Sequence, residues 1–273
     1  MQGFSGYDMY SHHDDAEGDS SADSEDYNKM INFYQSEIKS KNTYSGQKLP
    51  KGVSIIIGHA NESFLRKDFD DAIELCHEAI RIFPENSEPY HLMSIIYGEK
   101  QDMKKSVDFL FISTQLNNQS DKESWWRIAD KYYNLKCYKN ASYCYGRALK
   151  CEKLNVSLLR KKAECYDKLK DWRGAIKYYE KVLNILPNDV QIVKRLAKSY
   201  NKMDHPLKGI TLLIDYLIRF SSHQINFDIV SILCDLMISK DLYQELVYLI
   251  YSISKDERKL VHLQRSISLL SLS

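Results

Sequence analysis

The sequence predicts an all-α protein, a right-handed superhelix (an α-solenoid) of stacked helix pairs that follows a disordered acidic segment. Two observations predict this fold: a short motif recurs about every 34 residues, and the 273 residues include only ten Gly and five Pro. An all-β fold with many tight turns uses more of both residue types. Self-similarity at a period of roughly 20–50 residues is the signature of a solenoid or array.

The recurring motif joins a polar turn, a large apolar residue, two polar residues and a small residue. Its copies are 67–72 (KDFDDA), 101–106 (QDMKKS), 136–141 (KCYKNA) and 170–175 (KDWRGA), which start 34, 35 and 34 residues apart. Each copy suits the connection between two antiparallel helices, because a small residue lets the helices cross closely. Small residues also recur in the preceding helix, at Ala60, Ser94, Ala129, Ala163 and Ala197. This is the tetratricopeptide-repeat (TPR) pattern.

The pattern divides the chain into three predicted parts. These are an acidic disordered tail at 1–48, a TPR array at 49–260, and an end at 261–273 that is either a poor cap or a truncation, since a solenoid needs a polar cap. Within the array we expect units at about 53–86, 87–120, 122–155, 156–189, 190–223 and 227–260. The fifth unit is degenerate, with Gly209 in place of the usual Ala, and the sixth fits only in part.

Charge is distributed unevenly along the chain. Residues 1–50 carry nine acidic and four basic residues, a net charge of −5, and 51–273 carry 28 acidic and 34 basic residues, a net charge of +6. Between 8 and 26 there are eight acids and no base, so this stretch cannot bury enough apolar surface to offset its conformational entropy. The small positive charge of the array gives only weak support for direct binding of nucleic acid. Because no uninterrupted apolar run of about 18 residues is present, we expect no membrane partner.

The sequence carries no motif of a catalytic or metal site. It lacks a glycine-rich phosphate loop, a nucleophile elbow and an H-E-x-x-H motif, so we expect no enzyme activity, no catalytic residue, no cofactor and no small-molecule substrate. None of the six Cys forms a C-x-x-C pair, which is typical of free, mostly buried thiols in a reducing compartment. Cys137, Cys144 and Cys151 are seven residues apart, a spacing unlike the paired ligands of structural zinc, and we expect no metal.

The first helix of each TPR unit is expected to line a concave groove. The register predicts a partner-binding groove formed by Asn61, His91, Trp126, Asp130, Tyr133, Arg160, Glu164, Lys168, Lys194, Lys198 and Lys202. Trp126 beside Tyr133 is a candidate hot spot, or it packs on the edge of Tyr133 without a partner; Trp125 is expected to pack between repeats. The basic side chains either form a solvated face or attract an acidic partner or the chain's own acidic tail.

Several segments of the array resemble one family of TPR proteins. These are 58–64 (GHANESF), 68–73 (DFDDAI), 80–84 (IRIFP), 126–129 (WRIA) and 144–150 (CYGRALK). They are similar to the opening of the TPR subunit of RNA polymerase III general transcription factor IIIC, over about residues 52–249. Asn118 and Lys153 depart from the family, which has Pro at both positions, and family members are much longer, with a second TPR array.

The resemblance implies a non-catalytic scaffold in the nucleus. Its protein partners would be other transcription factor IIIC subunits and the subunits of initiation factor IIIB, which it would help to recruit for RNA polymerase III transcription. Three alternatives stay open: a ubiquitin ligase scaffold, a co-chaperone, or the TPR arm of a glycosyltransferase. The co-chaperone clamp is poorly matched. Its five positions fall on Ile57, Asn61, Leu92, Glu123 and Arg127, and only two of these carry the expected type of side chain.

Overall fold

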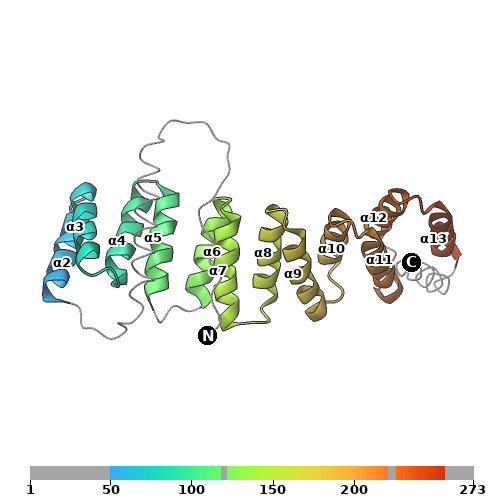
Figure 1. Cartoon of the computed structure of the whole chain (residues 1–273), viewed down its shortest axis with the longest axis horizontal. Coiled ribbons are helices and arrows are strands. Elements are labelled where there is room, and N and C mark those ends of the chain that lie inside the picture. Colours follow the sequence, from blue (N-terminus) through green and yellow to red (C-terminus); the bar gives the residue numbers. More distant parts are fainter. Residues whose placement is uncertain (1–49, 118–121, 221–225, 256–273) are drawn as a thin grey trace. The chain divides into compact units, whose positions relative to one another are not determined.

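The computed structural model describes residues 50–117, 122–220 and 226–255. Within these ranges every regular element is an α-helix, so the prediction of an all-α repeat fold is confirmed (Figure 1). The predicted tail at 1–48 and the predicted end at 261–273 lie outside the described residues. No helix in the described ranges combines the length and the apolar character that crossing a membrane requires.

The chain divides into two compact units, residues 1–140 and 141–273. The first contains α2 (Lys51–Leu65), α3 (Phe69–Ile82), α4 (Ser87–Glu99), α5 (Met103–Leu116) and α6 (Lys122–Asn134). Helix α7 (Tyr138–Cys151) begins in the first unit and lies mostly in the second. The second further contains α8 (Val156–Lys168), α9 (Trp172–Ile185), α10 (Val190–Lys202), α11 (Pro206–Phe220), α12 (Phe227–Ile238) and α13 (Tyr243–Lys255). Within each unit, α2 packs on α3, α4 on α5, α8 on α9, α10 on α11 and α12 on α13.

The first helix of each pair ends in the same backbone turn. One residue of each turn has a left-handed backbone with φ between 57° and 64°: Lys67, Gln101, Lys136, Lys170, Asp204 and Asp241. The next residue donates its N–H to the carbonyl five positions back, as Asp171 does to Tyr166 at 2.9 Å. This is a Schellman turn, which satisfies carbonyls at a helix end. Four of the six turns are the motif copies found in the sequence, and those at Asp204 and Asp241 continue the repeat.

Short acidic and amide side chains begin the helices of the array. The carboxylates of Asp68, Asp102 and Asp171 cap second helices, and Asp171 accepts the Gly174 N–H at 2.9 Å. First helices begin after the caps Asn86, Asn155, Asp189 and Asn226. Each cap satisfies a backbone N–H that the helix itself leaves unpaired. Helix starts are therefore set by local sequence, at the recurring places that the motif marks.

Small residues sit where the two helices of a pair cross. In the α4–α5 pair the Ser106 hydroxyl donates to the Ser94 carbonyl at 2.7 Å. In the α10–α11 pair, a Cβ on Gly209 would lie 3.0 Å from the Ala197 carbonyl oxygen. Such a contact is tighter than ordinary packing, so the departure from Ala at position 209 accompanies a closer approach of these two helices.

Aromatic and aliphatic side chains fill the layers between successive pairs. Trp125 is buried and meets the edge of Phe111, with ring centroids 5.9 Å apart, as expected for a residue that packs between repeats. Tyr179 on α9 and Leu213 on α11 each stand nine residues after the left-handed residue of their own repeat, and both are fully buried. Ile250 stands at the same position on α13 and is 56% exposed. This stacking face of α13 is thus uncovered by the part of the chain that the structure describes.

Candidate protein-binding surface

The predicted groove residues of the first unit lie on the first helices α2, α4 and α6. Asn61 and His91 are exposed, and Trp126, Asp130 and Tyr133 are half-buried. The Tyr133 ring packs edge-on against Tyr138, with centroids 5.4 Å apart and planes at 72°. An aromatic pair of this geometry holds the Tyr133 ring in one orientation. Each of the five side chains keeps at least part of its surface accessible.

Two cations of the predicted groove in the second unit are neutralised within the chain. Arg160 on α8 forms an ion pair with Asp189, whose carboxylate also caps α10. Lys194 on α10 forms an ion pair with Asp228, in the first turn of α12. Both cations occupy the fifth position of their units, and both acids stand at the start of the next first helix. These pairs therefore link successive repeats, and the same cations are less available to a partner.

A third cation, Arg195, joins three helices of the second unit. Its guanidinium lies 3.7 Å from Glu164 and 3.5 Å from Asp167, both on α8. Arg195 also donates to the Tyr179 hydroxyl on α9 at 3.5 Å, and burial raises the pKa of Tyr179 to about 12. Glu164, a predicted groove residue, is therefore held by the protein itself. Sequence reasoning missed Arg195, because its two acidic partners lie about 30 residues earlier in the chain.

The remaining lysines of the predicted groove are open to solvent. Lys168, Lys198 and Lys202 are exposed. Across the described ranges, no salt bridge involves any of the three. Lys198 and Lys202 are four residues apart on α10, so they share one face of the helix. Among the basic residues of the predicted groove, Arg160 and Lys194 are thus engaged in internal ion pairs, and Lys168, Lys198 and Lys202 are free for a ligand.

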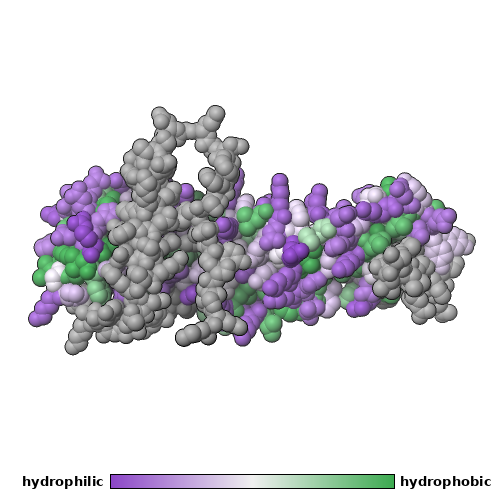
Figure 2. All heavy atoms as spheres, in the orientation of Figure 1, coloured by the Kyte–Doolittle hydropathy of each residue, from purple (hydrophilic) through white to green (hydrophobic). Residues whose placement is uncertain are grey.

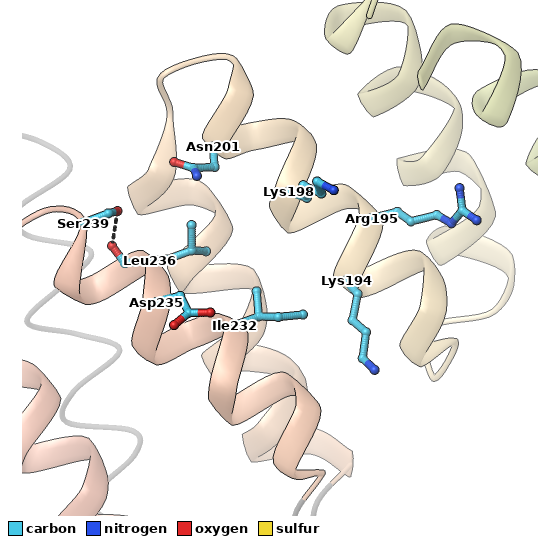
Figure 3. A pocket seen from close by; sticks show the side chains of 8 residues that line it. All are labelled: Lys194, Arg195, Lys198, Asn201, Ile232, Asp235, Leu236 and Ser239. Atoms are coloured by element: carbon cyan, nitrogen blue, oxygen red, sulfur yellow. Dashed lines mark hydrogen bonds between the residues drawn. The ribbon is translucent and has the colours of Figure 1, made fainter. Parts of the chain in front are cut away.

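A cleft of about 290 Å³ separates α10 from α12. It is lined by Lys194, Arg195, Lys198 and Asn201 from α10, and by Ile232, Asp235, Leu236 and Ser239 from α12 (Figure 3). The structure therefore brings two predicted groove residues, Lys194 and Lys198, to the same depression. The sequence-based groove did not include the α12 wall. The groove-facing positions nine and thirteen of a first helix fall on Asp235 and Ser239 in the sixth unit, so the register could have found it.

The surface near this cleft combines polar and apolar side chains. Figure 2 shows hydrophilic and hydrophobic residues interspersed over α8 to α12. On α12, Phe227 is 77% and Ile238 48% exposed. A polar rim next to accessible apolar area is the usual composition of a protein-binding surface.

The cysteines are free thiols and half of them are buried, namely Cys76, Cys144 and Cys165. Burial raises the pKa of the Cys76 thiol to about 12, which disfavours the nucleophilic thiolate. Considering only residues that the structure describes, no three His, Cys, Asp or Glu side chains gather in an arrangement that could hold a metal ion.

The positions of a co-chaperone clamp do not form a binding site for a carboxylate. Ile57 and Leu92 are buried, each 6% exposed. Glu123 and Arg127 face each other on α6, with 3.4 Å between Oε1 and Nε. A clamp needs unpaired cations and amides directed at the ligand, and four of the five positions here are apolar or paired with each other.

Comparison with known proteins agrees with the repeat fold. The tetratricopeptide-repeat family profile matches residues 156–189, which contain α8 and α9. General transcription factor 3C polypeptide 3 from Homo sapiens is 33% identical over 214 residues, which cover 76% of this chain and 24% of the relative. The chain is a TPR protein similar to transcription factor IIIC subunits. The resemblance noted in the sequence is thereby confirmed.

Two further matches extend the comparison. The transcription factor tau 131 kDa subunit of Saccharomyces cerevisiae is 26% identical over 160 residues, 59% of this TPR chain and 16% of the yeast protein. A solved structure of Naa15/Naa10 bound to HypK-THB matches at a TM-score of 0.51 with 14% identity, covering 81% of this chain and 34% of that chain; this likeness concerns the fold alone. The chain spans about a quarter of the human relative and 16% of the yeast relative.

Proposed function

We propose that this protein is a non-catalytic TPR scaffold of transcription factor IIIC, which binds other subunits of that factor and helps to recruit initiation factor IIIB for RNA polymerase III transcription. In this role it acts in the nucleus and contacts DNA mostly through the complex. The observation that carries the proposal is the 33% identity to General transcription factor 3C polypeptide 3 over 76% of the chain.

The surface supports a role in protein binding. The predicted groove residues lie on successive first helices, and Asn61, His91, Lys168, Lys198 and Lys202 are exposed there. Trp126 adds a half-buried indole on α6, and a partly accessible Trp is a frequent anchor of protein interfaces. In the first unit these side chains offer hydrogen bonds and apolar area to a protein partner, and in the second unit they offer positive charge.

The test is a binding assay with the full chain. The chain is immobilised and incubated separately with each recombinant subunit of factors IIIC and IIIB from the same organism. We expect retention of at least one subunit of each factor, and weaker retention by a Trp126→Ala variant. Lys208→Glu serves as a control, since Lys208 is exposed on α11 and lies outside the predicted groove. Retention of no subunit of either factor would contradict the proposal.

A further inference from the structure

The seventh position of the fourth repeat carries a lysine where three other repeats carry a buried apolar residue. The same register holds Met93, Ile128 and Leu196, which are at most 2% exposed. Lys162 on α8 takes this position in the fourth repeat and is half-buried. Its ammonium group lies beside Gly146 of α7, because a Cβ on that glycine would lie 2.6 Å from the Lys162 Nζ. The contact between α7 and α8 therefore makes room for a cation.

Two further lysines, both on α9, gather around the same spot. The Lys162 Nζ lies 4.8 Å from the centre of the Tyr178 ring, and the Lys181 Nζ lies 5.2 Å from it. Tyr166 stacks on Tyr178, with ring centroids 5.6 Å apart. Burial, and further the charge of Lys177, lower the pKa of Lys162 below its ordinary value, so the Lys177 ammonium is also close. Three ammonium groups thus share one small area of the second unit.

The carboxylates of the surrounding helices are engaged elsewhere. Helix α7 contains no acidic residue, and α8 and α9 together contain Glu164, Asp167 and Glu180. Glu164 and Asp167 lie against Arg195, and Glu180 accepts a hydrogen bond from the Tyr200 hydroxyl at 2.5 Å. Within the described ranges, no salt bridge involves any of the three lysines. A half-buried cation beside two like charges is unfavourable, so this arrangement favours the binding of an anion.

We propose that Lys162, Lys177 and Lys181 bind a phosphorylated serine or threonine of a partner protein. A phosphate monoester carries a charge of about −1.5 to −2 at pH 7 and three acceptor oxygens, which matches three ammonium groups that converge from two helices. The half-buried Lys162 marks the centre of the site, and the exposed Lys177 and Lys181 can turn onto the ligand. None of the three belongs to the predicted groove, so the inference adds a separate, phosphorylation-dependent contact to the proposed scaffold.

The compactness of the lysine cluster favours a phosphate monoester over the backbone of a nucleic acid. Proteins that bind a single strand combine a basic groove along its backbone with aromatic side chains on which the bases stack. Here the Tyr178 ring already contacts Tyr166 and two ammonium groups. The cluster is also short, because Lys177 and Lys181 are one turn apart on α9. It therefore suits one concentrated negative charge better than a row of single charges.

The test follows the lysine ammonium signals of the full chain, labelled with ¹⁵N, by NMR during a titration. The probe is the peptide GGGSGGG phosphorylated on its serine, and the same peptide without phosphate is the comparison. We expect saturable shifts of the Lys162 and Lys181 signals with a Kd of about 1–10 mM, since each mostly exposed ion pair contributes little. The unphosphorylated peptide should bind at least about tenfold more weakly. Equal binding of the two peptides, or no shift with the phosphopeptide, would overturn the inference.

Two variants separate recognition from loss of folding. Lys181→Gln should weaken phosphopeptide binding at least about threefold, whereas Lys208→Gln, which removes an exposed charge on α11, should leave it unchanged. Lys162→Met restores the apolar type of residue found at this register. It should abolish the binding and keep or raise the thermal midpoint in phosphate-free buffer, because an uncompensated half-buried charge is removed. Unchanged binding by Lys162→Met together with a lower midpoint would make Lys162 a packing residue only, and would overturn the inference.

Two further probes identify the source of the phosphate. Inorganic phosphate should shift the same signals, and shifts with that ion but none with the phosphopeptide would restrict the site to a free ion and contradict the inference. A single-stranded octamer of thymidylate should bind no more tightly than the phosphopeptide. Tighter binding of the octamer that Lys181→Gln weakens would assign the cluster to nucleic acid instead. If factor IIIC or IIIB subunits are retained by the chain and the phosphopeptide does not bind, the inference fails and the proposed function stands.

Discussion

The Tyr132 hydroxyl donates a 2.7 Å hydrogen bond to a carboxylate oxygen of Asp108, and both side chains are buried. Asp108 lies on α5 and Tyr132 on α6, so the bond joins the second helix of one repeat to the first helix of the next. Burial of a carboxylate is unfavourable unless it is hydrogen-bonded. The pair therefore fixes the register between these helices as well as contributing to stability.

Replacing Tyr132 by Phe should destabilise the protein, although the ring is retained. The change removes one hydrogen bond to a buried carboxyl group, and such bonds contribute about 1–3 kcal/mol. Urea denaturation followed by circular dichroism measures the loss. Tyr178→Phe is the matched control, because the half-buried Tyr178 stacks its ring on Tyr166 and makes no hydroxyl hydrogen bond in the described ranges. The interpretation fails if the two variants lose the same free energy of unfolding.

Trp125 and Trp126 are neighbours that should respond very differently to truncation. Trp125 is 2% exposed and packs on Phe111, so Trp125→Ala should cost about 3–5 kcal/mol. Trp126 is only half-buried, so Trp126→Ala should cost less than half as much. Thermal denaturation of both variants makes the comparison. Equal losses would mean that α6 is rotated about its axis relative to the described structure.

The turns and the layers between repeats were predictable because local chemistry determines them. Asp68 and Asp171 cap the helix that follows each turn, and the small residues behind them set the helix crossing. Which of the cations form ion pairs within the chain was not predictable. Lys194 binds Asp228, 34 residues later, and that pairing depends on the stagger between α10 and α12, which helix periodicity does not specify.

The recurring left-handed turn predicts a substitution that stabilises the protein, whereas most substitutions destabilise it. Lys170 has a φ of 58°, a conformation that is unfavourable for residues with a Cβ and easily adopted by Gly. After allowing for the greater freedom of Gly in the unfolded chain, Lys170→Gly should raise the free energy of unfolding by up to about 1 kcal/mol. The same substitution at Lys177, within α9, should lower it by about 1 kcal/mol.

Thermal denaturation of these two glycine variants checks the turn geometry. The Lys170→Gly midpoint should lie above that of the unmodified chain, and the Lys177→Gly midpoint below it. Both variants lose one positive charge, so a difference between them reports on the backbone. A lower midpoint for Lys170→Gly would show that the turn after α8 is not left-handed in solution.

His77 should make the stability of the protein depend on mildly acidic pH. Burial, and then the nearby Arg81 guanidinium, lower the pKa of His77 in the folded state below its ordinary value of 6.5. The unfolded chain therefore binds the proton first as the pH falls, and the contribution of His77 to stability, complete above about pH 6.5, is lost progressively below it. Urea denaturation between pH 7.5 and 5.5 should show a decline that is shallower in His77→Gln. If the two proteins lose stability in parallel over this interval, His77 takes up its proton equally in both states, and the half-buried environment on α3 is not present in solution.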